Sequence, residues 1–212
     1  MTASVPWPKL KRNIVAILRG VTPDEIAGIG DALHEAGVEA IEVPLNSPDP
    51  FRSIELLSKR LPDALTGAGT VVRIGDVDRL HQAGGRLLVA PNVDPGVLSR
   101  AAGFGMVTMP GVFTATEAFL AYHAGASALK FFPASVLGPA GISALKAVLP
   151  REAVVGAVGG VSEADFAAYA KAGVTAFGLG SSLYKPGLDR NEVAKRARAA
   201  VAAYDEVFGR TA

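Results

Sequence analysis

Short apolar runs recur eight times along the chain, and a segment with helical periodicity follows each of them. The runs occupy residues 14–18, 40–45, 65–70, 87–91, 106–110, 128–133, 154–159 and 176–180. They lack the alternation of apolar and polar residues that marks a half-exposed strand, so they are typical of parallel strands buried on both faces. Strands that alternate with helices predict an α/β fold whose sheet is either open and doubly wound or closed. Eight units favour closure into a (β/α)₈ TIM barrel.

Capping signals mark the ends of the helical segments. A threonine followed three residues later by a glutamate, the spacing of a capping box, occurs at residues 22–25 and 114–117. Related start signals lie at residues 49–50 and 162–165, and the last helix is predicted over residues 191–207. Four segments end in an Ala-Gly pair, whose glycine can adopt the left-handed conformation that terminates a helix. These glycines are Gly37, Gly84, Gly125 and Gly173.

Length and composition set the class of protein. The chain has 212 residues, half of them hydrophobic, and no linker or low-complexity stretch, so we predict a single barrel domain over residues 1–212. The net charge is +1, and no stretch combines clustered Lys and Arg with aromatic residues. Nucleic acid and anionic membrane surfaces therefore have no predicted docking patch, and we expect a small-molecule partner. No apolar run approaches the roughly 18 residues of a membrane span, and no signal peptide is evident, so we expect a soluble cytoplasmic protein.

The sequence has no cysteine and only three histidines. The absence of cysteine excludes disulfides, thiolate ligands and a cysteine nucleophile. His34, His81 and His123 each lie shortly before a glycine that ends a helix, which places them at the end of the barrel opposite the carboxyl ends of the strands. There they would interact with the helix dipole or with solvent. We therefore expect no metal and no cofactor.

Lys130 is a candidate nucleophile. It lies inside the sixth apolar run, among aliphatic and aromatic neighbours. Burial disfavours its charged form and lowers its pKa, which supplies the free amine that attacks a carbonyl. A lysine at a strand edge whose head reaches water is the alternative interpretation.

Glu42 is a candidate general acid/base. It is the only carboxylate inside any of the eight runs. A buried carboxyl group that transfers protons near neutral pH has a raised pKa, whereas one that forms a structural ion pair does not need to. The two roles are compatible, because Glu42 could contact Lys130 and still transfer protons.

Polar residues at the ends of other strands are candidates for binding the substrate. Arg19 follows the first strand, where its planar guanidinium could bind a carboxylate, and Thr70 ends the third strand after two glycines. Glycine-rich segments follow the seventh and eighth strands, with Gly159 and Gly160 in one and Gly180 and Ser181 in the other. Backbone N–H groups and the N-termini of the following helices could hold a phosphate there without any lysine.

Taken together, these motifs resemble the class I 2-keto-3-deoxy-6-phosphogluconate (KDPG/KHG) aldolases over nearly the whole chain. The motifs that carry the resemblance lie at residues 16–20, 41–47, 67–71, 91–92, 128–133 and 158–161. The resemblance implies a (β/α)₈ barrel, commonly assembled as a homotrimer. It also implies that Lys130 forms the Schiff base, that Glu42 is catalytic, and that Gly159, Gly160 and Ser181 bind phosphate.

Two residues depart from the phosphogluconate pattern, Asn46 where that pattern has arginine and Val158 where it has threonine. Both departures are similar to the 2-dehydro-3-deoxy-6-phosphogalactonate branch of the family, in which Arg19 would take over the substrate carboxylate. The resemblance thus implies the C4 epimer as substrate, with Val158 and Asn46 as candidate specificity residues. Where the phosphogluconate pattern has a threonine hydroxyl, Val158 has an isopropyl group. Beside the C4 hydroxyl of the substrate, this change removes a hydrogen-bond partner and so changes which epimer is favoured.

Other functions remain open at this stage. The chain could act on the gluconate epimer or on both epimers. It could also be a phosphate-binding barrel isomerase or decarboxylase without a covalent lysine, or a phosphosugar-binding module without catalysis. The last is disfavoured, because a binding module gains nothing from two buried ionisable groups.

Overall fold

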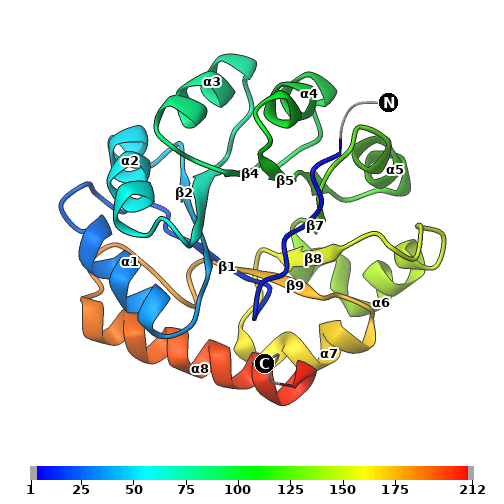
Figure 1. Cartoon of the computed structure of the whole chain (residues 1–212). Coiled ribbons are helices and arrows are strands. Elements are labelled where there is room, and N and C mark those ends of the chain that lie inside the picture. Colours follow the sequence, from blue (N-terminus) through cyan, green and yellow to red (C-terminus); the bar gives the residue numbers. More distant parts are fainter. Residues whose placement is uncertain (1–3, 210–212) are drawn as a thin grey trace.

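A ring of parallel strands surrounded by helices forms the protein, as Figure 1 shows for the computed structural model. The structure describes residues 4–209. The strands are β1 (Ile14–Ile17), β2 (Ala40–Pro44), β3 (Leu65–Gly69), β4 (Leu87–Val89), β5 (Val107–Met109), β6 (Gly111–Val112), β7 (Leu129–Phe131), β8 (Val155–Val158) and β9 (Ala176–Leu179). Each lies within or next to a predicted run, so the predicted (β/α)₈ barrel is confirmed.

The nine labelled strands correspond to eight barrel strands, because Pro110 divides the fifth into β5 and β6. Proline lacks an N–H group and interrupts the ladder of hydrogen bonds. The sheet order runs β5-β4-β3-β2-β1-β9-β8-β7-β6, and all of the pairings are parallel. Across the break, Ala128 N donates to Thr108 O at 3.1 Å and Lys130 N donates to Pro110 O at 2.9 Å. These bonds join the two edges of the sheet and close the barrel.

The helices form the outer layer of the molecule (Figure 1). They are α1 (Ile26–Glu35), α2 (Pro50–Arg60), α3 (Ile74–Gln82), α4 (Pro95–Gly103), α5 (Ala115–His123), α6 (Ala134–Lys146), the short 3₁₀ helix η1 (Glu163–Asp165), α7 (Phe166–Lys171) and α8 (Arg190–Phe208). The predicted glycine terminators are confirmed, since all four have positive φ. The last helix extends one residue beyond its predicted bounds at each end.

The predicted start signals differ in outcome. Thr114 and Glu117 form the complete capping box at the start of α5. The prediction for α1 was wrong by about one turn, because the Thr22 hydroxyl donates to the Glu25 carboxylate and the helix begins only at Ile26. Asp49 precedes α2 without a capping hydrogen bond from its side chain.

Two apolar layers hold the barrel together. The larger lies between strands and helices and includes Phe131, Phe166 and Phe177. The smaller fills the barrel interior and includes Met109. Met109 fits there because Gly156 faces it, and a Cβ at residue 156 would lie 2.2 Å from the Met109 terminal methyl. The interior is therefore packed with side chains and is not a pore.

The N-terminal segment runs along the side of the ring formed by β7, β8 and β9 before it enters β1 (Figure 1). Its partly buried Val5, Trp7 and Leu10 pack against the interior layer. In barrels of this class the ligand site forms at the carboxyl ends of the strands. In residues 4–209 no helix is long and apolar enough to cross a membrane.

Candidate active site

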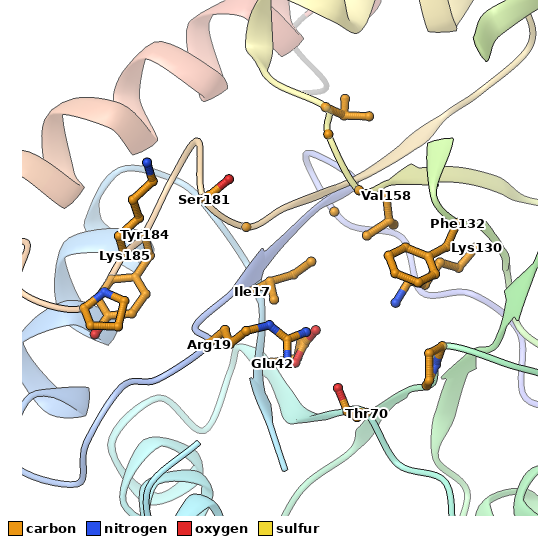
Figure 2. Close-up of a pocket in the computed structure, with 17 residues that line it drawn as sticks. Ile17, Arg19, Glu42, Thr70, Lys130, Phe132, Val158, Ser181, Tyr184 and Lys185 are labelled. Carbon is orange, nitrogen blue, oxygen red and sulfur yellow. The ribbon is translucent and has the colours of Figure 1, made fainter. Parts of the chain in front are cut away.

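A cavity of about 430 Å³ lies at the carboxyl ends of the strands. Nine of the ten side chains or glycines predicted as site residues line it, and Asn46 does not. The nine are Arg19, Glu42, Thr70, Lys130, Val158, Gly159, Gly160, Gly180 and Ser181. Figure 2 shows that Arg19, Glu42, Thr70 and Lys130 converge on one space from strands far apart in the sequence.

Lys130 lies in β7 and is only 6% exposed. Its ammonium nitrogen is 4.6 Å from the centre of the Phe132 ring. Burial lowers the pKa of Lys130 below its ordinary value; Glu42 opposes this shift by attraction, and Arg19 adds to it by repulsion. The side chain therefore presents a more readily deprotonated amine to the cavity than an exposed lysine would.

Glu42 lies in β2 and is 2% exposed. Burial raises its pKa to about 7, against the attraction of Lys130 and Arg19. Its Oε2 atom has no hydrogen-bond partner among the described residues. The carboxyl group is accommodated by Gly69, where a Cβ would lie 1.9 Å from Oε2. A carboxyl group with a pKa near neutrality and an unused oxygen can accept and return a proton.

Arg19 and Thr70 flank this pair. Arg19 Nη1 donates a hydrogen bond to Asn46 Oδ1 at 2.5 Å. Thr70 has φ of 58°, a left-handed conformation that a β-branched residue rarely adopts. Strained residues of this kind persist where the surrounding structure fixes them, often in a ligand site.

The glycine-rich segments lie on another side of the cavity. Gly159 and Gly160 have φ of 91° and 70°, a pair of left-handed residues directly after β8. The prediction that helix N-termini support both segments was wrong for the second, because α8 begins only at Arg190. Instead, Gly180 O accepts hydrogen bonds from Leu183 N and Tyr184 N, which form a single turn.

Sequence reasoning missed several lining residues, among them Ile17, Phe132, Tyr184 and Lys185. Ile17 and Val158 share an apolar wall, since a Cβ at Gly178 would meet both side chains. Lys185 adds a cation to the cavity lining near Ser181, where we expected a phosphate to be held without any lysine (Figure 2). A lysine four residues after Ser181 was the available signal for it.

The three histidines lie near the helix ends opposite this cavity, as predicted. His34, His81 and His123 fall in the last turns of α1, α3 and α5. His81 also stacks on Phe104 at 4.0 Å, a contact that the sequence did not reveal. No group of three or more His, Asp or Glu that could hold a metal ion occurs within residues 4–209.

Comparison with known proteins gives consistent matches. The family model described as KDPG and KHG aldolase matches residues 9–199. A protein of Rhizobium meliloti (strain 1021), named "Probable 2-dehydro-3-deoxy-6-phosphogalactonate aldolase", is 59% identical over 206 residues, which are 97% of this chain and 97% of that protein.

Solved structures agree with this match. A structure titled "Native KDPGal structure" has a TM-score of 0.93 and 47% identity, over 95% of this chain and 98% of the other. A protein cage "designed by fusing symmetric oligomeric domains" has a TM-score of 0.91 and 48% identity, over 93% of this chain and 73% of the other. Both similarities extend over nearly the whole barrel.

Proposed function

The chain belongs to the KDPG and KHG aldolase family, and on that premise we propose that it cleaves 2-dehydro-3-deoxy-6-phospho-D-galactonate to pyruvate and D-glyceraldehyde 3-phosphate through a Schiff base on Lys130. The protein is thus a carbon–carbon lyase of the class I, metal-independent type. The observation that carries the proposal is a buried lysine on β7 and a buried carboxylate on β2 that line one cavity. The names of the similar proteins support the galactonate series.

The first half of the reaction forms the covalent intermediate. The neutral amine of Lys130 attacks the C2 carbonyl and gives a carbinolamine. Glu42 accepts and returns protons, directly or through a water, as the C2 hydroxyl leaves as water. The product is an iminium ion that can accept an electron pair.

The second half breaks the carbon–carbon bond. Glu42 removes the proton of the C4 hydroxyl, the C3–C4 electron pair moves into the iminium, and C4 leaves as the aldehyde of D-glyceraldehyde 3-phosphate. Protonation of the enamine at C3, by the carboxylic acid that Glu42 has become, gives the pyruvate Schiff base. Hydrolysis then releases pyruvate and regenerates the amine.

The other lining residues hold the two ends of the substrate. Arg19 and Thr70 bind the C1 carboxylate, and Gly159, Gly160, Gly180 and Ser181 bind the phosphate. Fixing both ends positions the C3–C4 bond between Lys130 and Glu42. The cavity volume of about 430 Å³ suits a ligand of this size.

Val158 supports the choice of epimer. Its side chain lines the cavity and offers no hydrogen-bonding atom. The isopropyl group shares its wall with Ile17, which is also apolar. An epimer that needs a hydroxyl partner there would bind less well.

Borohydride trapping tests the covalent step. The intact protein is incubated with excess pyruvate and sodium borohydride, and the adduct is located by peptide mapping. We expect one adduct on Lys130 and none in a Lys130→Ala variant. Absence of an adduct from the native protein would instead favour a non-covalent barrel isomerase or decarboxylase.

Steady-state kinetics tests the substrate. We expect a higher kcat/KM on the galactonate epimer than on the gluconate epimer, and a Val158→Thr variant should narrow that ratio. Equal values for the native enzyme would indicate an aldolase that accepts both epimers.

We also infer that the chain acts as one barrel domain assembled as a homotrimer. Support comes from the similar cage structure, whose title describes fused symmetric oligomeric domains. Sedimentation equilibrium on the purified protein tests the assembly. A mass three times that of the chain is expected, and a monomer at micromolar concentration would contradict it.

A further inference from the structure

We propose that Asn46 is a positioning residue that holds the guanidinium of Arg19 in place to bind the substrate carboxylate. The proposal rests on the proposed function, in which Arg19 binds C1. It replaces the sequence-based expectation that Asn46 itself determines specificity. The supporting observation is the hydrogen bond from Arg19 Nη1 to Asn46 Oδ1, 2.5 Å long.

Asn46 is placed to act through Arg19 and not on the substrate. Arg19 lines the cavity, whereas Asn46 lies outside its lining, in the turn after β2. The two residues come from neighbouring strands, since β1 pairs with β2 in register. A hydrogen bond that joins a cavity residue to a residue outside the lining is the geometry of a supporting side chain.

The backbones on both sides of this contact are already fixed. Gly20 N donates to Ser47 Oγ at 3.0 Å, one residue beyond the Arg19–Asn46 pair. Leu18 N donates to Glu42 O at 2.9 Å on the other side. These backbone hydrogen bonds do not fix the long side chain of Arg19. The hydrogen bond to Asn46 does so, because it is made by the terminal Nη1 atom of that side chain.

An amide suits this role better than a carboxylate would. The Asn46 oxygen accepts one of the five N–H groups of the guanidinium and leaves the rest for a ligand. Because the amide is neutral, it does not compensate the positive charge of Arg19. That charge remains available both to the substrate carboxylate and to the buried pair, since Arg19 influences the pKa of Glu42 and of Lys130.

The test measures the condensation direction, with pyruvate and D-glyceraldehyde 3-phosphate as separate substrates. Only pyruvate carries the carboxylate that Arg19 binds. In an Asn46→Leu variant we expect the KM for pyruvate to rise about 3- to 10-fold, the effect of freeing one side chain with many rotamers. The KM for D-glyceraldehyde 3-phosphate should stay unchanged.

A substitution at Asp49 is the matched control. Asp49 is exposed, lies three residues after Asn46 and has φ of 37°, a left-handed conformation that asparagine tolerates as well as aspartate does. An Asp49→Asn variant therefore alters the same loop without touching Arg19. We expect it to keep the native KM for both substrates.

A double-mutant cycle with Arg19→Ala separates positioning from a general structural role. If Asn46 acts through Arg19, adding Asn46→Leu to Arg19→Ala changes the KM for pyruvate no further. The acid limb of the pH profile gives a second readout. When Arg19 moves away from Glu42 and Lys130, the pKa of each rises, so this limb should shift to higher pH in Asn46→Leu.

The outcomes distinguish failure of this inference from failure of the proposed function. A native protein that forms no pyruvate adduct on Lys130 would overturn the function. An active native enzyme whose Asn46→Leu variant keeps its pyruvate KM, or loses affinity for both substrates alike, would overturn the positioning role. Additive effects of Asn46→Leu and Arg19→Ala would overturn it as well.

Discussion

Glu42 and Lys130 are each destabilising for the barrel, because burial disfavours the charged form of both. The two groups lie in one cavity, and their mutual attraction offsets part of that cost. A neutral pair and an ion pair differ only in the position of one proton, and burial brings the two forms closer in energy because it raises the pKa of Glu42 and lowers that of Lys130. The placement that weakens the fold is thus the one that the proposed chemistry requires.

Replacing Glu42 by Gln should therefore separate activity from stability. Turnover is expected to fall by about 10² to 10⁴-fold, the usual contribution of a general acid/base, while the Schiff base with pyruvate still forms slowly. The pKa of Glu42 is raised to about 7 from 4.5. Folding thus favours its protonated form, and the stability that this form contributes is present below 4.5 and is lost as the pH rises through 7.

The variant should then be more stable than the native protein at pH 8, by about 1 to 3 kcal/mol, with the difference vanishing toward pH 4.5. Urea unfolding at several pH values measures this, and circular dichroism verifies the fold. Unchanged turnover would remove Glu42 from the mechanism. A variant less stable than the native protein at pH 8 would contradict the burial argument.

Residues with an unusual local context could be found from the sequence alone. Lys130 and Glu42 are charged residues inside apolar runs, so their burial could be predicted without knowing their neighbours. Lys185 and Tyr184 were not found, because they follow β9 in a loop whose path depends on tertiary packing. The contact of Asn46 with Arg19 was missed for a related reason, since an exposed amide at a strand end gives no sign of which side chain it contacts.

At the scale of the element, β3 illustrates how one strand serves both the packing of the barrel and the proposed catalytic site. It contains Gly67 and Gly69, which point to the same side because strand residues alternate. A Cβ at Gly67 would lie 1.8 Å from the backbone oxygen of Leu87 in β4. A Cβ at Gly69 would meet the Glu42 carboxyl group instead.

The same substitution should therefore have different effects at the two glycines. Gly67→Ala forces β3 and β4 apart, and we expect a loss of stability of about 3 kcal/mol, the upper end for an overpacked site. Gly69→Ala displaces the Glu42 side chain, and we expect kcat to fall about 100-fold with a smaller loss of stability. Thermal unfolding and kinetics on both variants measure the contrast. Equal losses of stability with equal activities would contradict it.

The break at Pro110 shows which element features the sequence could predict. The fifth apolar run predicts a strand that ends with this proline. The structure continues the strand beyond Pro110, because Pro110 O still accepts a hydrogen bond from Lys130 N. The sequence shows that Pro110 has no N–H group to donate. It does not show that the carbonyl oxygen of Pro110 accepts a hydrogen bond from β7.

At the scale of the molecule, the sequence predicted that the ring of strands closes. It did not predict the ion pair that joins the segment before β1 to the last helix. The eightfold recurrence of strand and helix specifies the barrel, because each unit repeats the same burial pattern. Arg12 and Asp205 lie 193 residues apart, and each looks like an ordinary surface charge in the sequence. In the structure Arg12 Nε and Nη2 donate to the two Asp205 oxygens, both at 2.7 Å.

This ion pair ties the segment before β1 to α8, the last helix of the ring. The side chains of Arg12 and Asp205 are 17% and 14% exposed, so water and salt screen their attraction less than that of a fully exposed ion pair. The hydrogen bonds to Asp205 raise the pKa of Arg12, against the effect of burial. We expect Arg12→Ala and Asp205→Ala each to destabilise the fold by about 2 kcal/mol, within the range for hydrogen bonds between charged groups.

The double variant distinguishes one coupled contact between the segment before β1 and α8 from two unrelated surface effects. If the pair acts as a unit, Arg12→Ala combined with Asp205→Ala should cost little more than either single variant, and the coupling should persist at about 0.5 M salt, a concentration that weakens exposed pairs. Arg190→Ala and Glu35→Ala, which break an exposed pair between α8 and α1, form the matched control cycle. Because Arg12 and Asp205 lie far from the cavity, kcat should remain that of the native enzyme in all of these variants. Additive losses at Arg12 and Asp205 would show instead that the two ends of the chain are held to the ring independently of each other.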